Sequence, residues 1–535
     1  MEAKPVQTPA HGSVPSDAGA APRRAALILA ALILAAGVAN LNLSVANVAL
    51  PTIGKALDSG QTGLNLVAVG FSLGLAGSVL YLGALGDRYG RKLMLILGLV
   101  LSVPAAILAA TAPSIEVLFF ARLLGGLAAG MAYPTTLALI TALWSGHKRV
   151  AAIALWSGLG GAISALGPLA AGWMLGIFDW GSVFLMTVPI ALVTLVLVIV
   201  VVPAKVNEGT ERVDHLGGVL SVVFVSTLVL AINLAAMPDE GMTALVFVGI
   251  AVVAGAGFFV RQRRAPNPLF DLHVAKRRIF WVAAVGGIIV FGSLMGAMYV
   301  GQQYLQNVLG YTALESGASI LPAAILMVVA APVSARLVAR RGSRFVLLVG
   351  FAASLLGFLV MLVFWDVGSS FAPVGIAYAL VGLGVGLAGA PASSSLTRSV
   401  PVSRAGMASG TADLQRDLGG SIMQSILGAL LTAGYASAVA ASIASAPASA
   451  RSQITSSVQS QLSKSFDGAV SIADRYPSYS ASIIEAARQS FLQGADWAYF
   501  VGMVAMLVGA ALVLLLFPGK AREAELLAEY AATDK

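Results

Sequence analysis

Long apolar stretches recur along nearly the whole chain, and they constrain the fold more than any other feature of the sequence. Most are about 20–30 residues long, which is the length that an α-helix needs to cross a hydrocarbon layer about 30 Å thick. No series of ten-residue alternating segments, typical of outer-membrane β-barrels, is present. We therefore expect an all-α, polytopic membrane protein whose fourteen spans lie near 25–50, 64–86, 93–112, 117–143, 150–176, 181–202, 216–236, 242–260, 279–303, 316–338, 345–365, 371–396, 406–434 and 496–517.

Charged residues are too few for a soluble protein. They make up 10% of the 535 residues, whereas a soluble domain has about 25%, so we expect the lipid bilayer to surround the chain. The net charge of +8 is spread over short loops, which indicates membrane orientation and no nucleic-acid partner. The sequence predicts no metal site and no cofactor, because it has no cysteine and its histidines fall in tails or loops: His11, His147, His215 and His273.

The basic residues fall mainly on one side of the expected spans. When loops are assigned alternately from the N-terminus, 25 of the 32 Lys and Arg residues lie on one side and five on the other, while Arg122 and Arg416 lie within spans. Loops rich in Lys and Arg stay in the cytoplasm. We therefore expect a bacterial inner-membrane protein with both termini cytoplasmic. If the loops were assigned with one helix more or fewer, the charge asymmetry would disappear. The asymmetry therefore also supports the count of fourteen spans.

Two short motifs each occur twice. The segment 83–92 has a weaker copy at 335–344, and 125–134 has a copy at 382–391, with offsets of 252 and 257 residues. Similar offsets indicate two related halves separated by an insertion. We expect a 6 + 2 + 6 arrangement, with a disordered tail at 1–24, a six-helix bundle at 25–202, two inserted helices and cytoplasmic linkers at 203–278, a second bundle at 279–517 and a cytoplasmic tail at 518–535.

The segment 435–495 interrupts the second bundle and is expected on the extracytoplasmic side. Apolar residues at every fourth position predict one amphipathic helix that ends before Pro477. Two interpretations stay open, a passive surface helix and a lid over the outer mouth. The apolar positions are Ile454, Val458, Leu462, Phe466 and Val470.

The loop after the second span carries a specific ten-residue pattern, with Gly83, Asp87, Arg88, Gly90 and Arg91 at its fixed positions. Glycines allow a tight turn, and Asp87 can face the N-terminus of a neighbouring helix while the basic residues stay in the cytosol. The pattern resembles the signature loop of the major facilitator superfamily. That resemblance implies a gating role for the loop.

The fifth span contains Gly158 and the sequence Gly167-Pro168-x-x-Ala171-Gly172. Small residues allow helices to approach closely, and Pro168 bends the span. The pattern looks like the antiporter motif of the same superfamily, with Ala171-Gly172 in place of a glycine pair.

Three further segments narrow the resemblance: 47–51 at the end of span one, 305–311 after span nine and 405–410 at the start of span thirteen. Together with the fourteen spans they resemble the drug:proton antiporters of the EmrB/QacA type. The resemblance covers nearly all of 25–517 and implies an antiporter that exports amphipathic small molecules in exchange for protons.

Span one departs from that family. The family usually has an aspartate there, whereas this chain has Asn42, which cannot carry a proton. Arg122 matches the arginine of span four, which the family places beside the proton path. It is expected either to keep that function or to hydrogen-bond polar groups of span one such as Asn40 or Asn42.

Four ionisable residues lie inside spans, where each costs about 2.5–3.5 kcal/mol on insertion scales. Besides Arg122 they are Asp413, Arg416 and Asp417 of span thirteen. The two aspartates are four residues apart and share one helix face, with Arg416 beside them. They are expected to form either a proton or cation site or a structural salt bridge within the span.

The resemblance and the buried charges together favour proton-coupled export of amphipathic small molecules, a multidrug efflux activity. No phosphate-binding motif and no nucleophile–base arrangement is present, so neither ATP-driven transport nor an enzyme is expected. The alternatives are export or flipping of an endogenous lipid or metabolite, and a ligand sensor without turnover. A periplasmic adaptor is a further partner if the host has an outer membrane. The residues expected to line a substrate cavity are Tyr81, Tyr133, Trp156, Tyr299, Gln302, Gln303, Gln306, Tyr378 and Gln415.

Overall fold

The computed structural model describes residues 22, 24–58, 61–204, 206, 212–235, 240–401, 404–445 and 454–534, and these form helices without any β-strand. The expected tail 1–24 lies almost wholly outside the described residues. The helices are α1 (Ala25–Ala56), α2 (Gln61–Tyr89), α3 (Arg91–Ala110), α4 (Ile115–Leu143), α5 (Gly146–Leu175), α6 (Ser182–Leu185), α7 (Thr187–Val201), α8 (His215–Ala235), α9 (Gly241–Arg264), α10 (Leu272–Ala275), α11 (Arg278–Asn307), α12 (Ala313–Ala318), α13 (Leu321–Arg341), α14 (Ser343–Phe364), α15 (Phe371–Arg398), α16 (Ala405–Ser445), α18 (Ser456–Lys464), α19 (Phe466–Arg475), the 3₁₀-helix η2 (Pro477–Tyr479), α20 (Ser480–Leu516) and α21 (Lys520–Thr533).

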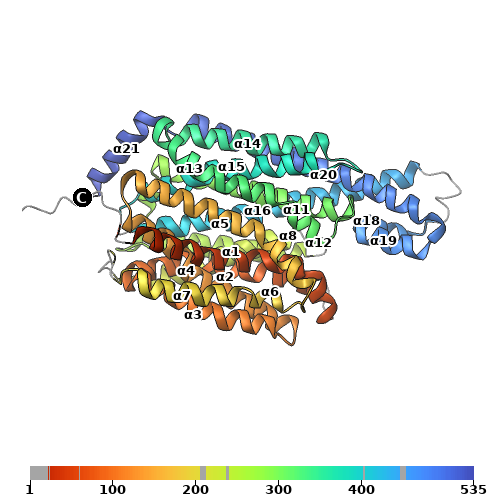
Figure 1. Cartoon of the computed structure of the whole chain (residues 1–535), viewed down its shortest axis with the longest axis horizontal. Helices are drawn as coiled ribbons and strands as arrows, with labels where there is room; N and C mark the ends of the chain where they lie inside the picture. Colours follow the sequence, from red (N-terminus) through yellow and green to blue (C-terminus); the bar gives the residue numbers. More distant parts are fainter. Residues whose placement is uncertain are drawn as a thin grey trace, which may run out of the picture.

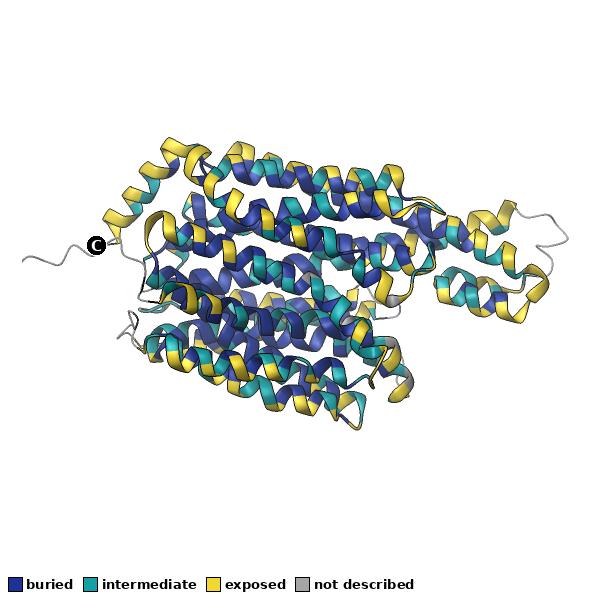
Figure 2. Cartoon of the chain, in the orientation of Figure 1, coloured by how far each residue is buried: buried dark blue, intermediate teal, exposed yellow. Residues whose placement is uncertain are grey.

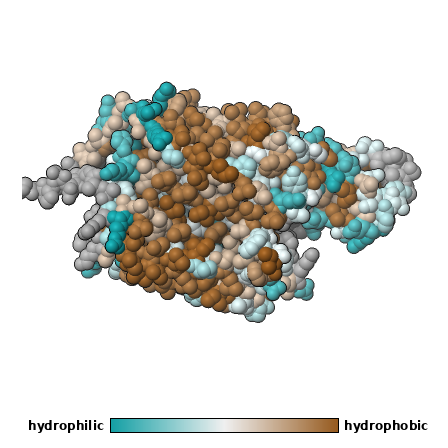
Figure 3. Space-filling model, in the orientation of Figure 1, coloured by the Kyte–Doolittle hydropathy of each residue, from teal (hydrophilic) through white to brown (hydrophobic). Residues whose placement is uncertain are grey.

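Fourteen helical segments within the described ranges are long and apolar enough to cross a membrane, which confirms the predicted all-α fold and the number of spans. Span six combines α6 with α7, and span ten combines α12 with α13. A broad hydrophobic band covers the bundle in Figure 3, with hydrophilic residues gathered towards its two ends. The exposed positions lie on the outer helices, and the interior of the bundle is buried (Figure 2). The chain is a multi-pass membrane protein.

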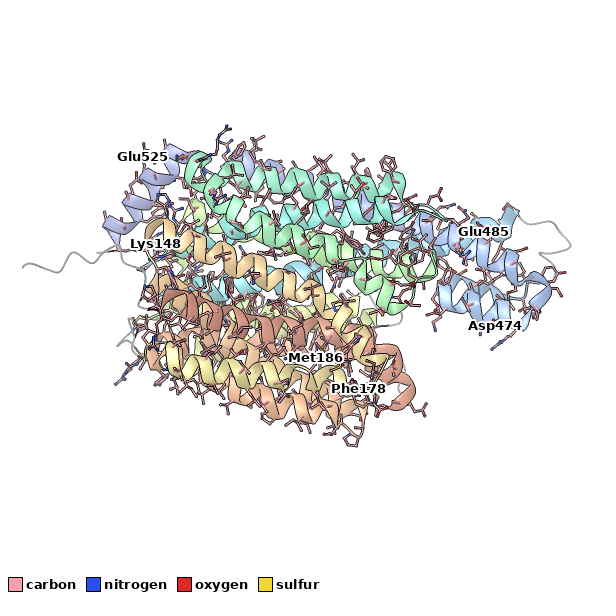
Figure 4. All side chains as sticks on the ribbon, in the orientation of Figure 1. Lys148, Phe178, Met186, Asp474, Glu485 and Glu525 are labelled. Atoms are coloured by element: carbon pink, nitrogen blue, oxygen red, sulfur yellow. The ribbon has the colours of Figure 1, made fainter. Side chains whose placement is uncertain are left out.

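The two ends of the bundle are distinct. We call the end that carries Lys148 and Glu525 the basic end, and the opposite end, towards Phe178 and Met186, the far end (Figure 4). Loops rich in Lys and Arg gather at the basic end, for instance Arg340 and Arg341 at the end of α13.

The spans that precede α8 form one group of helices and those that follow α9 form a second group, and the two groups meet along a central seam (Figure 1). Across the seam α5 packs against α13, and α16 packs against α2. The fifth spanning helix of each half thus contacts the second spanning helix of the other half. Such reciprocal contact is what a two-fold relation between repeated halves produces.

The duplicated loop motif has the same backbone in both copies. Gly90 links α2 directly to α3 with φ = 118°, and Gly342 links α13 directly to α14 with φ = 84°. Positive φ angles in this range favour glycine because a side chain would clash with the backbone. The two glycines are 252 residues apart, which is the offset of the motif itself.

The helices α8 and α9 pack on one another, and α8 contacts both α2 and α16. The Tyr81 hydroxyl lies 2.7 Å from His215 Nδ1, which joins α2 to α8. The buried Asp214 carboxylate accepts a hydrogen bond from Arg261 Nε at 3.0 Å, which joins the start of α8 to the end of α9. The pair therefore covers one side of the seam between α2 and α16.

At the far end α16 and α20 run well past their apolar parts, and α18 and α19 pack against them beyond the bundle (Figure 1). We call residues 435–445 and 454–495 the appendage. The prediction of one amphipathic helix from Ile454 was wrong. Two short helices meet at Ser465, whose extended backbone ends α18 and whose Oγ accepts a hydrogen bond from Gly468 N to start α19. The second of these helices, α19, does end before Pro477, as expected.

Candidate functional site

The helix α16 carries all the ionisable residues of span thirteen, and successive side chains point to different neighbours. Gln415 is buried and donates a hydrogen bond to Ala283 O of α11 at 2.8 Å. Arg416, the next residue, points across the seam to α4 and α5. Within one turn of α16, Gln415 therefore bonds to the second half, to which α16 itself belongs, and Arg416 presents its positive charge to the first half.

Arg416 lies among three aromatic rings. Its guanidinium carbon is 4.6 Å from the ring centre of Trp156, 4.7 Å from that of Phe291 and 5.5 Å from that of Tyr133. It donates hydrogen bonds to the Tyr133 hydroxyl and, at 3.3 Å, to Ser157 Oγ. A cation placed over several aromatic faces is stabilised by their quadrupoles. We call Tyr133, Trp156 and Phe291 the aromatic cage.

The cage is itself held in place. The Trp156 indole N–H donates to Thr136 Oγ1 at 2.9 Å, and the Trp156 side chain is only 1% exposed. Tyr133 and Trp156 come from α4 and α5 of the first half, while Phe291 comes from α11 of the second half. The cage thus spans the seam, and Arg416 ties the two halves together at its centre.

The carboxyl groups of Asp413 and Asp417 have a different environment. They are 1% and 7% exposed, and Arg416 forms no ion pair with either of them within 4 Å in the described structure. Both oxygens of Asp413 and Oδ2 of Asp417 lack a hydrogen-bond partner among the described residues. The described structure therefore shows no direct salt bridge within span thirteen, because the aromatic cage holds the guanidinium of Arg416. A buried carboxyl group without partners is tolerated when it holds a proton or a cation.

Arg122 occupies a second buried polar site, inside the first half. It is 2% exposed, and its Nη1 donates to the backbone oxygen of Asn42 at 2.5 Å while its Nε donates to Val67 O at 3.5 Å. The Asn42 side chain donates to Val38 O at 3.0 Å and does not bond to the guanidinium. Arg122 thus bonds to the backbone of span one, and Asn40 bonds instead to Gly160 O of α5.

The loop motif forms a third site, at the basic end. Asp87 Oδ2 accepts a hydrogen bond of 2.7 Å from Gly406 N, at the N-terminus of α16, so it faces a helix N-terminus as the sequence predicts. Asp87 Oδ1 pairs with Arg91 at 2.7 Å, and Arg91 also donates to Val206 O at 3.4 Å. A carboxylate at a helix N-terminus is stabilised by the free N–H groups there. The first half is thereby fastened to the start of the helix that carries Asp413 and Asp417.

Comparison with known proteins decides the family. The sequence profile of the Major Facilitator Superfamily matches residues 32–424. This chain belongs to the Major Facilitator Superfamily.

Several relatives in the superfamily are similar over most of the chain. Multidrug resistance protein Stp of Mycobacterium tuberculosis is 31% identical over 386 residues, which is 71% of each chain. Multidrug efflux pump LfrA of Mycolicibacterium smegmatis is 34% identical over 63% of this chain and 67% of its own. Methyl viologen resistance protein SmvA of Salmonella typhimurium is 32% identical over 59% of this chain and 65% of its own.

A solved structure shows the same fold at low sequence identity. The human organic anion transporter MFSD10 (TETRAN) superimposes with a TM-score of 0.60 over 92% of this chain and all of its own, with 13% identity. The superfamily fold is therefore found in the structure as well as in the sequence.

Two glycines of the α5 pattern that resembles the antiporter motif lie at helix contacts. A methyl group on Gly158 would lie 2.6 Å from Ala331 Cβ of α13, and one on Gly167 would overlap Ser44 of α1. Gly317 of α12 lies against the backbone of Pro168 and Leu169. Gly158 and Gly167 thus let α5 approach α13 and α1 closely, and α5 also lies against α12 at Gly317.

The residues expected to line one substrate cavity do not lie together. Tyr133 and Trp156 form the cage around Arg416, but Gln415 points to α11, Tyr81 contacts His215 and Tyr378 packs against Trp365 within the second half. Gln302 donates to Ser316 O, and Gln303 donates to Tyr299 O of its own helix. Gln306 is exposed, and Tyr299 is 43% exposed.

Sequence reasoning missed several members of the two inner sites. Ser157 and Phe291 at Arg416, and Phe71 and Phe184 at Arg122, are ordinary membrane-helix residues in sequence. The only signal for Ser157 was its place next to Trp156. No group of three His, Asp or Glu residues that could hold a metal is found among the described residues.

Proposed function

We propose that this chain is a proton-coupled exporter of amphipathic small molecules, and that it favours cations with delocalised charge. The observation that carries the proposal is the pair of buried carboxyl groups of Asp413 and Asp417, one turn apart on α16 and without hydrogen-bond partners on three of their four oxygens. The relatives support export, because their names describe multidrug resistance, multidrug efflux and methyl viologen resistance.

The two carboxyl groups couple proton movement to substrate binding. In the packed arrangement a proton on each group removes the cost of burying its charge. When the halves separate and water reaches α16, the groups can release their protons to that side. A cationic substrate that arrives there neutralises the carboxylates that form. Proton release and substrate binding therefore favour one another, which is the thermodynamic requirement for antiport.

The aromatic cage supports the preference for cations. Arg416 occupies it with a planar, delocalised charge, which is also the character of an aromatic cationic drug. A substrate that entered the cage would displace Arg416, whose charge would then be free to approach Asp417. The cage therefore acts as a substrate site that the protein fills with its own side chain between transport events.

The orientation of the protein in the membrane follows from the charge asymmetry of the loops. The basic end is cytoplasmic by the positive-inside rule, so both termini are cytoplasmic and the appendage lies outside the membrane. The contact between Asp87 and Gly406 N then closes the cytoplasmic side of the seam. Residues 83–92 act as the gate, Arg122 and Asn42 provide a polar path in the first half, and the glycines of α5 allow it to rock against α13.

The test uses the full-length chain in liposomes, with substrate flux and internal pH recorded together. Asp413→Asn should abolish efflux driven by a pH gradient but permit downhill substrate exchange, because exchange needs the conformational change and no net proton movement. Asp417→Asn should do the same if the carboxyl groups titrate as a pair, and should shift the pH optimum if Asp417 only tunes its neighbour. Asp474→Asn, the same change at an exposed position of the appendage, is the matched control.

Two outcomes would refute the proposal. Full proton-coupled transport by the double variant would show that the protons pass elsewhere. Saturable substrate binding by the wild-type chain without any flux, under every gradient, would instead indicate a ligand sensor.

A further inference from the structure

A small cavity inside the first half is lined mainly by alanine and glycine. It lies between α1, α3 and α4, with Phe71 of α2 and Phe184 of α6 beside it. Its volume, taken as the region that the centre of a water-sized sphere can reach, is about 20 Å³. That is room for one water molecule or one ion of similar size. The polar residues in its lining are Asn42, Ser102 and Arg122.

Arg122 brings a charge to this cavity that nothing in the described structure balances. Its side chain is 2% exposed, and its Nη2 has no hydrogen-bond partner among the described residues. The partners of its other nitrogens are backbone oxygens, of Asn42 and Val67, which carry no charge. The rings of Phe71 and Phe184 lie 4.8 and 5.7 Å from its guanidinium carbon.

The neighbouring polar groups cannot supply the missing charge. Asn42 Nδ2 donates to Val38 O, and Asn42 Oδ1 faces the Thr187 hydroxyl at 3.5 Å. Ser102 already donates its hydroxyl proton to Leu99 O. No carboxylate oxygen within the described ranges lies within 4 Å of a nitrogen of Arg122. A fully buried charge without a counter-charge is strongly unfavourable, and arginine does not lose its proton to escape the cost.

We propose that this cavity binds one small monovalent anion, chloride being the physiological candidate, with Arg122 Nη2 as its principal donor. The space for about one water-sized sphere favours chloride, which is only slightly larger than water, over sulfate, phosphate and organic carboxylates. Arg122 is seven residues from the start of α4 at the far end, about 10 Å into the helix.

The test measures binding and does not depend on transport. Purified full-length protein in lipid nanodiscs is melted in potassium chloride and in potassium gluconate of equal ionic strength. A ligand that binds only the folded state raises its melting temperature, and chloride about ten-fold above its dissociation constant should raise it by about 1–3 °C over gluconate. Bromide should replace chloride, and sulfate should not.

Two variants locate the effect. Asn42→Asp adds a negative charge to a residue that lines the cavity and whose backbone oxygen bonds to Arg122, and it should remove the dependence on chloride, as should Arg122→Gln if that protein folds. Asn40→Asp is the matched control, because Asn40 is on the same helix but bonds to Gly160 O and does not line the cavity. It should keep the full chloride shift.

Two results would overturn the proposal. The first is an equal melting temperature of the wild-type protein in chloride and gluconate. The second is an unchanged chloride shift in Asn42→Asp, which would place the anion at another site. A bromide-specific anomalous scattering peak beside Arg122 in a crystal would support the site directly, and its absence from well-ordered density there would count against it.

Discussion

Replacing Arg416 by glutamine should tighten the binding of a lipophilic monocation, because the cage would no longer be filled by the protein's own cation. A cation–π contact is worth about 0.5–2 kcal/mol, depending on its exposure. The two nearest rings, at 4.6 and 4.7 Å, thus stabilise Arg416 by about 1–4 kcal/mol, which a substrate must overcome. Removing this competition should lower the dissociation constant of the monocation by a factor of about 5 if the two contacts contribute about 1 kcal/mol, and by a factor of about 30 if they contribute about 2 kcal/mol.

The assay is equilibrium binding of radiolabelled tetraphenylphosphonium to purified protein in nanodiscs at one pH. Arg416→Lys is the control, since it keeps a cation near the cage and should gain little. A neutral amphipathic dye should bind equally to both variants and to the wild type.

Loss of the positive charge alone would also favour a cation, so the cage needs its own test. Adding Trp156→Leu to Arg416→Gln should reverse most of the gain, because Trp156 has the nearest ring. If Arg416→Gln binds the monocation no more tightly than the wild type, or if the double variant keeps the whole gain, the cage is not the cation site.

Three further outcomes are expected. Asp87→Asn should slow turnover several-fold without changing the affinity for the monocation, because a carboxylate at a helix N-terminus stabilises one conformation by about 0.3–2 kcal/mol and does not touch the cage. Normal turnover at normal protein levels would contradict this. Gly158→Leu should abolish transport, since even a methyl group would lie 2.6 Å from α13, whereas Gly249→Leu, with open space around it, should be harmless; equal flux in the two would count against the close approach of α5. In spheroplasts an added protease should cut a site inserted at Asp474 but not one inserted at Pro266, and the opposite pattern would invert the topology.

The spans were predictable because each needs about twenty apolar residues, and the sequence shows that directly. The ends of α16 and α20 were not, since Ser- and Ala-rich helix beyond the membrane has no apolar run to mark it. Span thirteen was expected to end near residue 434, yet α16 continues to Ser445. In the appendage the four-residue spacing indicated a helix correctly, but the break at Ser465 depends on a local cap rather than on the spacing.

The charged residues were found from sequence, but their partners were not. Spacing along one helix places Arg416 beside Asp417, and nothing in the sequence says that Tyr133 and Trp156 lie close enough to attract it away. For Arg122 the sequence did name Asn42 of span one as a possible partner, but not that the bond goes to its backbone oxygen, which no residue type encodes. Sequence names the groups that need a partner, and only the packing of separate helices decides which one they receive.

The length of α16 has a consequence for experiment. Its 41 residues make a rod about 60 Å long, with the contact between Asp87 and Gly406 N at one tip, Asp413 and Asp417 in the first third and the appendage at the other tip. A tilt of about 10° about its middle would displace that outer tip by about 5 Å, a distance that paired spin labels resolve. The appendage is therefore a natural reporter: if the proposed coupling holds, a label on it should read out, away from the aromatic cage, whether Asp413 and Asp417 carry protons.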